Sequence, residues 1–387
     1  MSPIVGDAVA VLDELYDPRW AESWDAVGLV TGDLDRPLSR VLLAVDPVQA
    51  VIDEAVAWGA DLLVTHHPLL LRGVHGVATT TPKGRAVTTL VRNDVALLVA
   101  HTNADVADPG VSDALAAALG VFGTTPLRPS SPAATYKLVT FVPPEDAARL
   151  IDALAAAGAG DIGGYERCAW TAEGTGTFRG GEGTNPAVGE RGRVENVTET
   201  RVEMVVPASS RRAVISALRA VHPYEEPAFD LLVTAPVPGA RGTGRVGHLA
   251  SPVALADFGR TVRQALPPTT AGVRVAGDPD STVTTVAVCG GAGDDLFDEV
   301  RASGADVFVT ADLRHHPASE ALEHGQPALV DCAHWATEWP WLHEAERLLL
   351  AGLGTRPGGS DSVETRVSQV VTDPWTALLA DDSRSPH

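Results

Sequence analysis

A segment near the start of this 387-residue chain recurs near its end, and this internal repeat limits the fold more than any other feature. Residues 44–68 (AVDPVQAVIDEAVAWGADLLVTHHP) are echoed by residues 287–317 (AVCGGAGDDLFDEVRASGADVFVTADLRHHP), and residues 97–105 (LLVAHTNAD) by residues 328–338 (ALVDCAHWATE). Apolar strands joined by crossovers of about a dozen residues indicate a parallel sheet covered by helices on both faces. The repeat therefore predicts two similar three-layer α/β halves.

A second, smaller repeat lies between the two halves. Residues 141–154 (FVPPEDAARLIDAL) and 205–218 (VVPASSRRAVISAL) share Val-Pro and then Ile, Ala and Leu in register. Each predicts a strand that ends at a proline and an amphipathic helix that follows it. The glycine-rich stretch 171–193 predicts a loop or hairpin between the copies, and residues 227–234 predict a last strand. The resulting β-α-β-β-α-β order is that of a ferredoxin-like domain.

These repeats give the expected division of the chain. We expect an α/β half at residues 1–127, an inserted ferredoxin-like α+β domain at 128–240 and a second α/β half at 241–387. The proline- and serine-rich stretch 128–135 and the proline- and glycine-rich stretch 236–247 are the predicted hinges.

Composition narrows the class of protein. The chain has 29 basic and 50 acidic residues, a formal net charge of −21, which argues against binding to nucleic acid or to an anionic membrane. Its three cysteines are far apart and form no CxxC pair, which fits a reducing compartment and speaks against a disulfide framework or a thiolate zinc site. The N-terminus does not resemble a signal peptide, and no apolar run is long enough to span a bilayer. We therefore expect a cytoplasmic protein.

Polar side chains gather in both halves at or near the C-terminal ends of predicted strands, where open α/β sheets bind ligands. They are His66, His67, His101 and Asp105 in the first half, and Asp312, His315, His316, His334 and Glu338 in the second. Histidine and carboxylate without thiolate suit Zn, Fe, Mn, Co or Ni. A His-x-x-x-acid spacing occurs in both halves, and a carboxylate from each half suits two metal ions roughly 3.5–4 Å apart. The sequence thus predicts a metal centre.

Several of these motifs also have simpler interpretations. A histidine beside a strand is most often an ordinary hydrogen-bonded residue, and for His315 and His316 a surface turn is as good an explanation as a ligand role. GGAG at 290–293 has the layout of a phosphate-binding turn, but the two aspartates that follow it favour a tight turn capped by acids. HPYEEP at 222–227 fits a ligand or partner contact as well as it fits an elaborate turn.

Seven motifs together resemble one known family. They are WDAVGL (24–29), LLAVDP (42–47), GADLLVTHHPL (59–69), AHTNAD (100–105), VAVCGGAG (286–293), GADVFVTADLRHH (304–316) and AHWATE (333–338). The chain is similar to the Nif-three-like dinuclear metal-centre family, whose members are often labelled GTP cyclohydrolase 1 type 2 homologues. The resemblance covers residues 1–127 and 242–375, and the insert with HPYEEPAFD resembles the CutA/PII-type ferredoxin-like domain of the longer bacterial members.

The resemblance implies two divalent metal ions per chain and a set of residues for them. The implied metal ligands are His66, His67, Asp105, His334 and Glu338. The implied catalytic residues are Glu338 and His101, the latter next to the metals and orienting Asp105 or a bound water. The chain departs from the family at Ala26, where the family has asparagine, and at Ala311, where it has glycine.

The resemblance leaves the reaction open. The activity suggested for the family is hydrolysis that opens the imidazole ring of GTP and releases formate, and a phosphoesterase would use a similar site. A non-enzymatic protein for metal binding, storage or regulation is the alternative from another class. The family also implies a small-molecule substrate, no nucleic-acid partner, no membrane and a homo-oligomer, specifically a toroidal hexamer.

Overall fold

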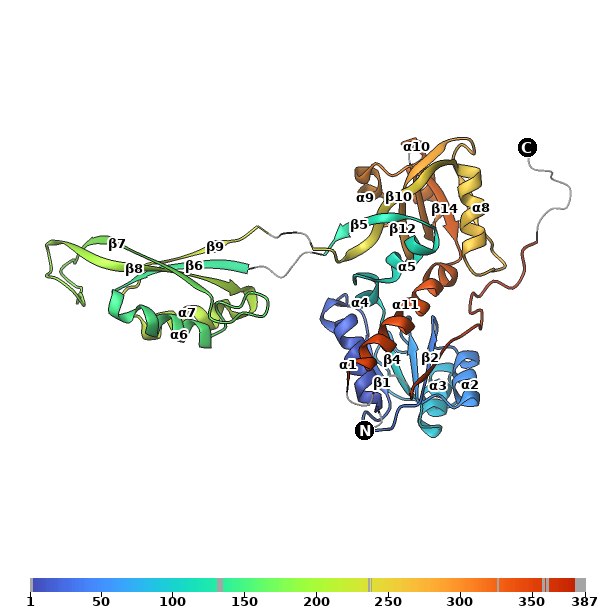
Figure 1. Ribbon diagram of the computed structural model, residues 1–387, viewed down its shortest axis with the longest axis horizontal. Coiled ribbons are helices and arrows are strands. Elements are labelled where there is room, and N and C mark those ends of the chain that lie inside the picture. Colours follow the sequence, from blue (N-terminus) through green and yellow to red (C-terminus); the bar gives the residue numbers. More distant parts are fainter. Residues whose placement is uncertain are drawn as a thin grey trace. The chain divides into compact units, whose positions relative to one another are not determined.

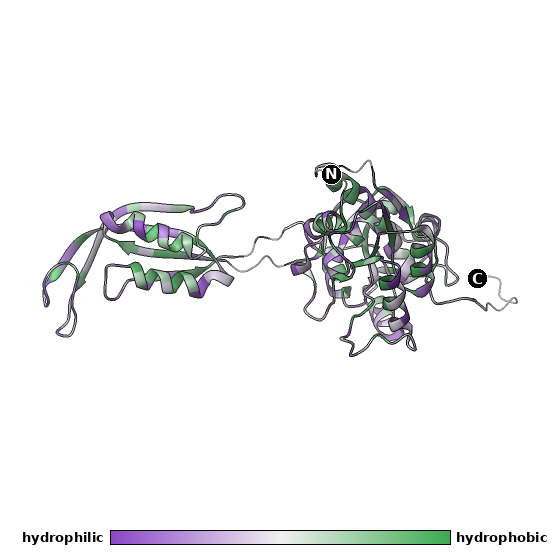
Figure 2. Cartoon of the chain, turned by 90° about the horizontal axis from the view of Figure 1, so that it is seen from below, coloured by the Kyte–Doolittle hydropathy of each residue, from purple (hydrophilic) through white to green (hydrophobic). Residues whose placement is uncertain are grey.

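The computed structural model describes residues 3–130, 135–235, 237, 239–325, 327–356, 359 and 362–379 (Figure 1). The chain divides into two compact units, the first made of residues 1–130 and 240–387 and the second of residues 131–239. The fold is mixed α/β, as the sequence predicts, and the strands and helices of both units carry apolar residues (Figure 2). Within the described residues, no helix is long and apolar enough to cross a membrane.

The first sheet is built mainly from the first half of the chain. In spatial order its strands are β1 (Gly28–Thr31), β4 (Ala96–Val99), β3 (Leu62–Thr65), β2 (Arg40–Ala44) and β15 (Glu364–Val367). Strands β2, β3 and β4 run parallel, and helices α2 (Gln49–Trp58) and α3 (Pro82–Arg92) connect them. Leu42 and Leu63 share a core with these helices, whereas Leu43 and Val64 belong to the core on the other face. Burial on both faces explains why the strands are continuous apolar runs.

The second sheet repeats this plan in the second half. In spatial order it contains β11 (Arg274–Ala276), β14 (Ala328–Cys332), β13 (Val307–Ala311), β12 (Thr282–Ala292), β10 (Gly242–Ala254) and β5 (Phe122–Pro129). Strands β12, β13 and β14 are parallel. Helices α9 (Phe297–Ser303) and α10 (His315–Glu323) share a core with one face, and helix α8 (Leu255–Ala265) packs on the other. The predicted duplication is therefore visible in the two sheets.

The two halves exchange strands, which the sequence analysis did not anticipate. Strand β15, from the C-terminal part of the chain, pairs with β2 of the first sheet. Strand β5, from the N-terminal part, pairs with β10 of the second sheet. Each half thus completes the sheet of the other, and neither sheet is built from one continuous stretch of sequence.

The predicted hinges are partly strand. Strand β5 continues to Pro129 and β10 begins at Gly242, so parts of 128–135 and 236–247 belong to the second sheet. The β5 strand tolerates its prolines because it lies at the edge of the sheet, where a missing N–H need not remove a ladder hydrogen bond. Some hinge residues lie outside the described residues, namely 131–134, 236 and 238.

Helix α11 (His334–Gly354) joins the two halves. It contacts β2 and β15 of the first sheet and β12 and β13 of the second. Its residues Trp341, Leu342 and Leu349 belong to one continuous core that also contains helices α1 (Val5–Leu15) and α5 (Val111–Ala118). Because α11 begins directly after β14, its first turns lie at the C-terminal edge of the second sheet.

The second unit has the predicted β-α-β-β-α-β order. Its elements are β6 (Thr135–Val142), α6 (Ala147–Ala156), β7 (Ala169–Arg179), β8 (Val194–Pro207), α7 (Arg211–Val221) and β9 (Phe229–Val233). The sheet has the order β7-β8-β6-β9 and is antiparallel throughout, which is a ferredoxin-like arrangement. Leu150 and Leu154 of α6 share one core with Val214 and Leu218 of α7 and with Val202 of the sheet.

The HPYEEP motif has a structural role in this unit. His222 Nε2 lies 2.9 Å from the carbonyl oxygen of Phe141, and the backbone N–H of Tyr224 donates to His222 Nδ1 at 3.1 Å. Both ring nitrogens are therefore used to fix the turn after α7, which accounts for the histidine of the motif without a ligand.

We expect the second unit to be removable. Residues Pro129 and Gly242 pair across β5 and β10, and the backbone N–H of Ser130 donates to the carbonyl oxygen of Arg241 at 2.9 Å. Replacing residues 131–240 with Asn-Gly, which favours a two-residue hairpin turn, should leave a soluble, cooperatively folding protein that still binds metal. Circular dichroism melting and metal analysis, compared with the full chain, measure this. Aggregation or loss of a cooperative transition would show that the first unit needs the second to fold.

Candidate metal centre

The strand-end residues predicted from the sequence come together in the first unit. His66 and His67 directly follow β3, and Asp105 ends the short helix α4 (Thr102–Asp105), which follows β4. Strands β3 and β4 are parallel neighbours, so these residues share one edge of the first sheet. His334 and Glu338 belong to the first turns of α11, where a spacing of four places them on the same side of the helix. Helix α11 thus brings the second half's contribution to the first.

Glu338 lies at the middle of this cluster and is 2% exposed. Its Oε1 is 2.9 Å from His334 Nε2 and 3.4 Å from His66 Nε2. Its Oε2 is 3.2 Å from His67 Nε2. Asp105 approaches from the other side, with Oδ1 at 3.6 Å from His66 Nε2. The carboxylate of Glu338 therefore connects three imidazoles that come from both halves.

Carboxylates outside the cluster hold two of these rings in place. Asp46, just after β2, accepts a hydrogen bond from His67 Nδ1 at 2.7 Å. Asp312, just after β13, accepts one from His334 Nδ1 at 2.6 Å. An Nδ1–H held in this way leaves Nε2 as the free nitrogen, the arrangement that supports histidine ligands of metals.

The other two histidines are anchored similarly. His66 Nδ1 donates to the carbonyl oxygen of Ala100 at 2.9 Å. His101 Nδ1 donates to Asp25 at 2.8 Å, and the fully buried Asp25 carboxylate also accepts hydrogen bonds from the backbone N–H and hydroxyl of Thr102. Burial and the neighbouring His66 lower the pKa of His101, although Asp25 opposes this shift. The hydrogen bond to Asp25 therefore fixes the orientation of the His101 ring, and its Nδ1 is the donor.

The arrangement fits a metal ion. His66 Nε2 and Glu338 Oε2 are buried without a hydrogen-bond partner, although such polar atoms are costly to leave unpaired. The potential ligand atoms form two groups, His66 with His67 and His101, and His67 with His334 and Glu338. In each group, the nitrogen and oxygen atoms all lie within 4.8 Å of one another. A His/Glu group at this place can hold a metal ion.

One glycine of the GGAG motif makes room for this group. Gly291 has a φ of +69°, in the left-handed region that favours glycine. A Cβ at Gly291 would lie 2.7 Å from Glu338 Oε1 and 3.1 Å from His334 Nε2. The motif ends a strand beside the cluster, so close approach explains this glycine.

The charges in the centre depend on one another. Burial opposes ionisation of Glu338, yet His67, His66 and His334 hold its pKa well below the usual range. Burial also disfavours the charged form of His67, but Glu338 and the hydrogen bond to Asp46 prevail and raise its pKa to about 11. Burial opposes a charge on His334 as well, but Glu338 and the hydrogen bond to Asp312 raise the pKa of His334 to about 10. A proton and a metal ion therefore compete for the same Nε2 atoms.

His101 and the pair His315 and His316 lie differently with respect to the cluster. The side chain of His101 bonds to Asp25, and its ring lies 5.2 Å from that of His66, centre to centre. His315 and His316 are exposed in the first turn of α10. Among the described residues, neither of them forms a hydrogen bond or ion pair with the cluster, so for this pair the surface interpretation holds.

Sequence reasoning assigned no role to Asp46. The residue lies in the LLAVDP motif directly after β2, so the strand-end rule that selected His66 and His67 would also have selected it. The hydroxyl of Thr372, far away in the sequence, donates to Asp46 Oδ2. No local pattern could have indicated that contact.

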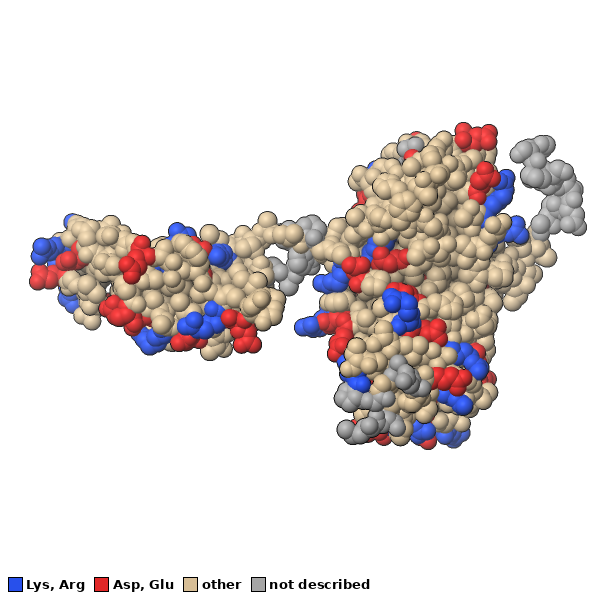
Figure 3. Space-filling model, in the orientation of Figure 1, with Lys and Arg blue, Asp and Glu red and all other residues tan. Residues whose placement is uncertain are grey.

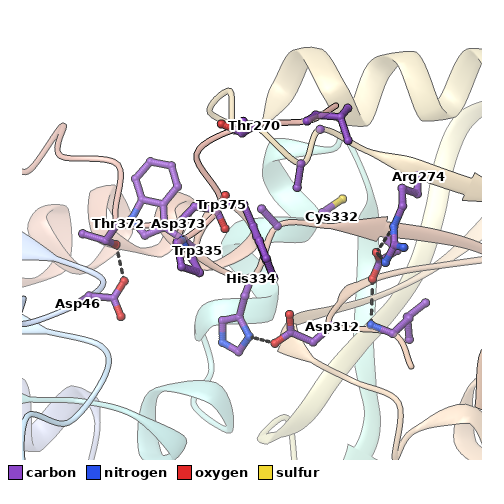
Figure 4. A pocket seen from close by; sticks show the side chains of 18 of the residues that line it. Asp46, Thr270, Arg274, Asp312, Cys332, His334, Trp335, Thr372, Asp373 and Trp375 are labelled. Carbon is purple, nitrogen blue, oxygen red and sulfur yellow. Dashed lines mark hydrogen bonds and ion pairs between the residues drawn. The ribbon is translucent and has the colours of Figure 1, made fainter. Parts of the chain in front are cut away.

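A cavity of about 710 Å³ opens beside His67 and His334 (Figure 4). Trp335, Trp375 and Leu378 contribute its apolar walls. The polar lining includes Asp46, Thr270, Arg274, Asp312, Asp331, Thr372 and Asp373. A cavity of this size next to metal-binding groups suits a ligand of metabolite size.

Comparisons with known proteins agree with this geometry. A sequence profile described as Duf34/NIF3 (NGG1p interacting factor 3) matches residues 3–374. A Mycobacterium tuberculosis protein named GTP cyclohydrolase 1 type 2 homolog is 50% identical over 376 residues, which make up 97% of either chain.

Solved structures show the same fold. Staphylococcus aureus protein SA1388 superposes with a TM-score of 0.80 and 28% identity, covering 98% of this chain and 100% of its own. A Bacillus cereus protein related to NIF3 has a TM-score of 0.69 and 35% identity, with the same coverage. The similarity therefore extends over both units.

Proposed function

Because this chain belongs to the Duf34/NIF3 (NGG1p interacting factor 3) family, we propose that it is a metal-dependent hydrolase with a dinuclear centre. The proposed ligands of two divalent ions (Zn, Fe, Mn, Co or Ni) are His66, His67, Asp105, His334 and Glu338. One observation carries the proposal: the free Nε2 atoms of three histidines surround a buried carboxylate, with two polar atoms left without partners.

The residues of the chain have separate parts in such a reaction. Bound divalent ions lower the pKa of water and polarise the bond to be hydrolysed. Asp46 and Asp312 keep the Nε2 atoms of His67 and His334 directed at the centre. His101, whose Nδ1 proton is held by Asp25, has a free Nε2 that can accept a proton. Trp335, next to His334, is buried and forms part of the cavity wall.

The proposed substrate is a nucleotide whose ring C–N bond is hydrolysed, in line with the names of the relatives. The cavity beside His67 and His334 is large enough for a small molecule of this kind. Nucleic acid is not a proposed partner, because the chain has a net charge of −21 and its basic side chains are mixed with acidic ones on the face shown in Figure 3. We also propose a cytoplasmic homo-oligomer, a hexamer in keeping with the family, and the free state of all three cysteines agrees with a reducing compartment.

The test is formate release from GTP. The protein is purified without chelators or a metal-binding tag, analysed for bound metal, and assayed with Zn²⁺, Mn²⁺, Fe²⁺, Co²⁺ or Ni²⁺. We expect metal-dependent formate release that disappears in His334→Ala, because this variant loses an Nε2 ligand, and persists in His316→Ala, whose histidine is exposed on α10. Metal content and phosphate release are measured in the same samples.

Other outcomes would replace the proposal. Phosphate release without formate would indicate a phosphoesterase. A metal-loaded protein that releases neither product would favour the non-enzymatic interpretation, in which the chain binds metal for storage or regulation. A wild-type protein that binds no metal would contradict the centre itself.

A further inference from the structure

The C-terminal strap, defined as residues 368–379, follows β15 and is held to the first half by side-chain hydrogen bonds. Ser368 Oγ donates to Glu54 Oε2 at 2.5 Å. Further along, Thr372 Oγ1 donates to Asp46 Oδ2 (Figure 4). Two contacts four residues apart fix the course of the strap along the first sheet.

Asp46 links the strap to the candidate metal centre. Its Oδ1 accepts the hydrogen bond from His67 Nδ1 at 2.7 Å, while its Oδ2 accepts the one from Thr372. The strap is thus separated from a proposed metal ligand by a single carboxylate. A ligand bound against the cavity-lining part of the strap would therefore lie beside the candidate centre.

Beyond Thr372 the strap becomes a wall of the cavity. Trp375 and Leu378 line it together with Trp335, which is 5% exposed (Figure 4). The side chain of Trp375 is 67% exposed and that of Leu378 is 68% exposed. Exposed indole surface in a cavity wall is unfavourable in water and is available to stack on a flat ligand.

The polar groups of the cavity indicate what such a ligand carries. Arg274 is the one arginine or lysine among the described lining residues, and it is already paired with Asp331. Asp373 instead has a buried carboxylate oxygen without a hydrogen-bond partner. Apart from His67 and His334 of the candidate centre, the cavity therefore offers acceptors more readily than cations, and it suits a ring with N–H groups on its edge better than an acyclic anion.

We propose that Trp375 stacks on a flat nitrogen heterocycle of the substrate and that Asp373 accepts hydrogen bonds from the N–H groups of that ring. The C-terminal strap then selects the organic part of the substrate while the metal centre acts on it. This assignment rests on the proposed function for the reaction at the metals. Binding of the ring itself depends only on the residues that line the cavity.

The experiment compares two probes that differ only in the ring, guanosine 5′-monophosphate and ribose 5-phosphate. Isothermal titration with the full chain, in metal-loaded and metal-free form, gives both dissociation constants. Stacking of a base on an aromatic side chain contributes enough that Trp375→Ala should weaken binding of the mononucleotide by about 5- to 150-fold. Binding of ribose 5-phosphate should not change. Trp375→Phe should retain most of the affinity, and Trp170→Ala, which removes an exposed indole of the second unit, serves as the matched control.

Several results would overturn the assignment. One is a wild-type protein that binds the mononucleotide no more tightly than ribose 5-phosphate. Another is an equal loss of both probes in Trp375→Ala. A third is an unchanged affinity together with a smaller particle in light scattering, which would mean that the indole packs against a second copy of the chain. Ring binding that depends on Trp375 without any formate release would retain the inference and contradict the proposed reaction.

Discussion

Glu338→Gln is expected to cost the protein both its metal and its turnover. The carboxylate lies between His66, His67 and His334, and it connects histidines from both halves of the chain. Glutamine keeps the shape, but it is neutral and would direct an N–H donor at a nitrogen or a metal ion. Loss of a group that merely orients a metal ligand weakens metal binding by about 10–100-fold, so loss of a charged ligand should weaken it at least as much. Turnover should fall by about 10²-fold or more, since it needs both the metals and a correctly placed proton acceptor.

Metal titration and formate release measure these two effects. The matched control is Glu344→Gln, the same change on the same helix at a residue whose side-chain partner is Arg347 at 2.6 Å. This control should keep full metal content and full activity. If Glu338→Gln bound two ions with unchanged affinity, Glu338 would not be a ligand, and the centre would have to be built from the histidines and Asp105.

Arg245→Ala is expected to produce the largest loss of stability. Arg245 is 1% exposed, and its guanidinium reaches Asp113 in α5 with two contacts of 2.7 Å. It also donates to the carbonyl oxygens of Gly242, Gly244 and Ala107 at 2.6, 2.9 and 2.6 Å. Alanine would leave the Asp113 charge and these buried oxygens without their partner.

Breaking a buried ion pair by removing one member costs about 3–5 kcal/mol. In a domain of this size, such a loss corresponds to a melting temperature lower by on the order of 10 °C. Differential scanning calorimetry measures it, and Arg260→Ala, which removes an exposed ion pair with Asp257, should shift the transition very little. An unchanged melting temperature in Arg245→Ala would contradict the view that this contact fastens the N-terminal segment to the second sheet.

Some features of the fold follow from local sequence. The strands around Leu42, Leu63 and Leu97 are short apolar runs because both faces of a parallel sheet are covered, and such runs are recognisable without knowledge of their partners. The ends of these runs are equally recognisable, which is why His66 and His67 could be selected as candidate ligands. The two copies of the strand-and-helix motif, at residues 141–154 and 205–218, likewise predict the order of elements in the second unit.

Other features have no local signal. Strand β5 (FGTTPLRP) contains two prolines and no apolar run, and its last two residues fall in the predicted hinge 128–135. Pairing with the neighbouring β10 makes it a strand. The sequence of β15 does not reveal that it pairs with β2 rather than with a strand of its own half. A buried arginine such as Arg245 is also indistinguishable from a surface arginine until its five acceptor atoms are known.

Local sequence predicts two α/β halves, an inserted unit and the residue types of the candidate metal centre, because burial periodicity and strand ends are properties of neighbouring residues. Tertiary packing places Glu338 of α11 among three histidines, lets Asp46, Asp312 and Asp25 orient the rings, and makes the strap that carries Trp375 a wall of the cavity. Most of these contacts join residues from 21 to more than 270 positions apart, and chain packing rather than local pattern sets which of them meet.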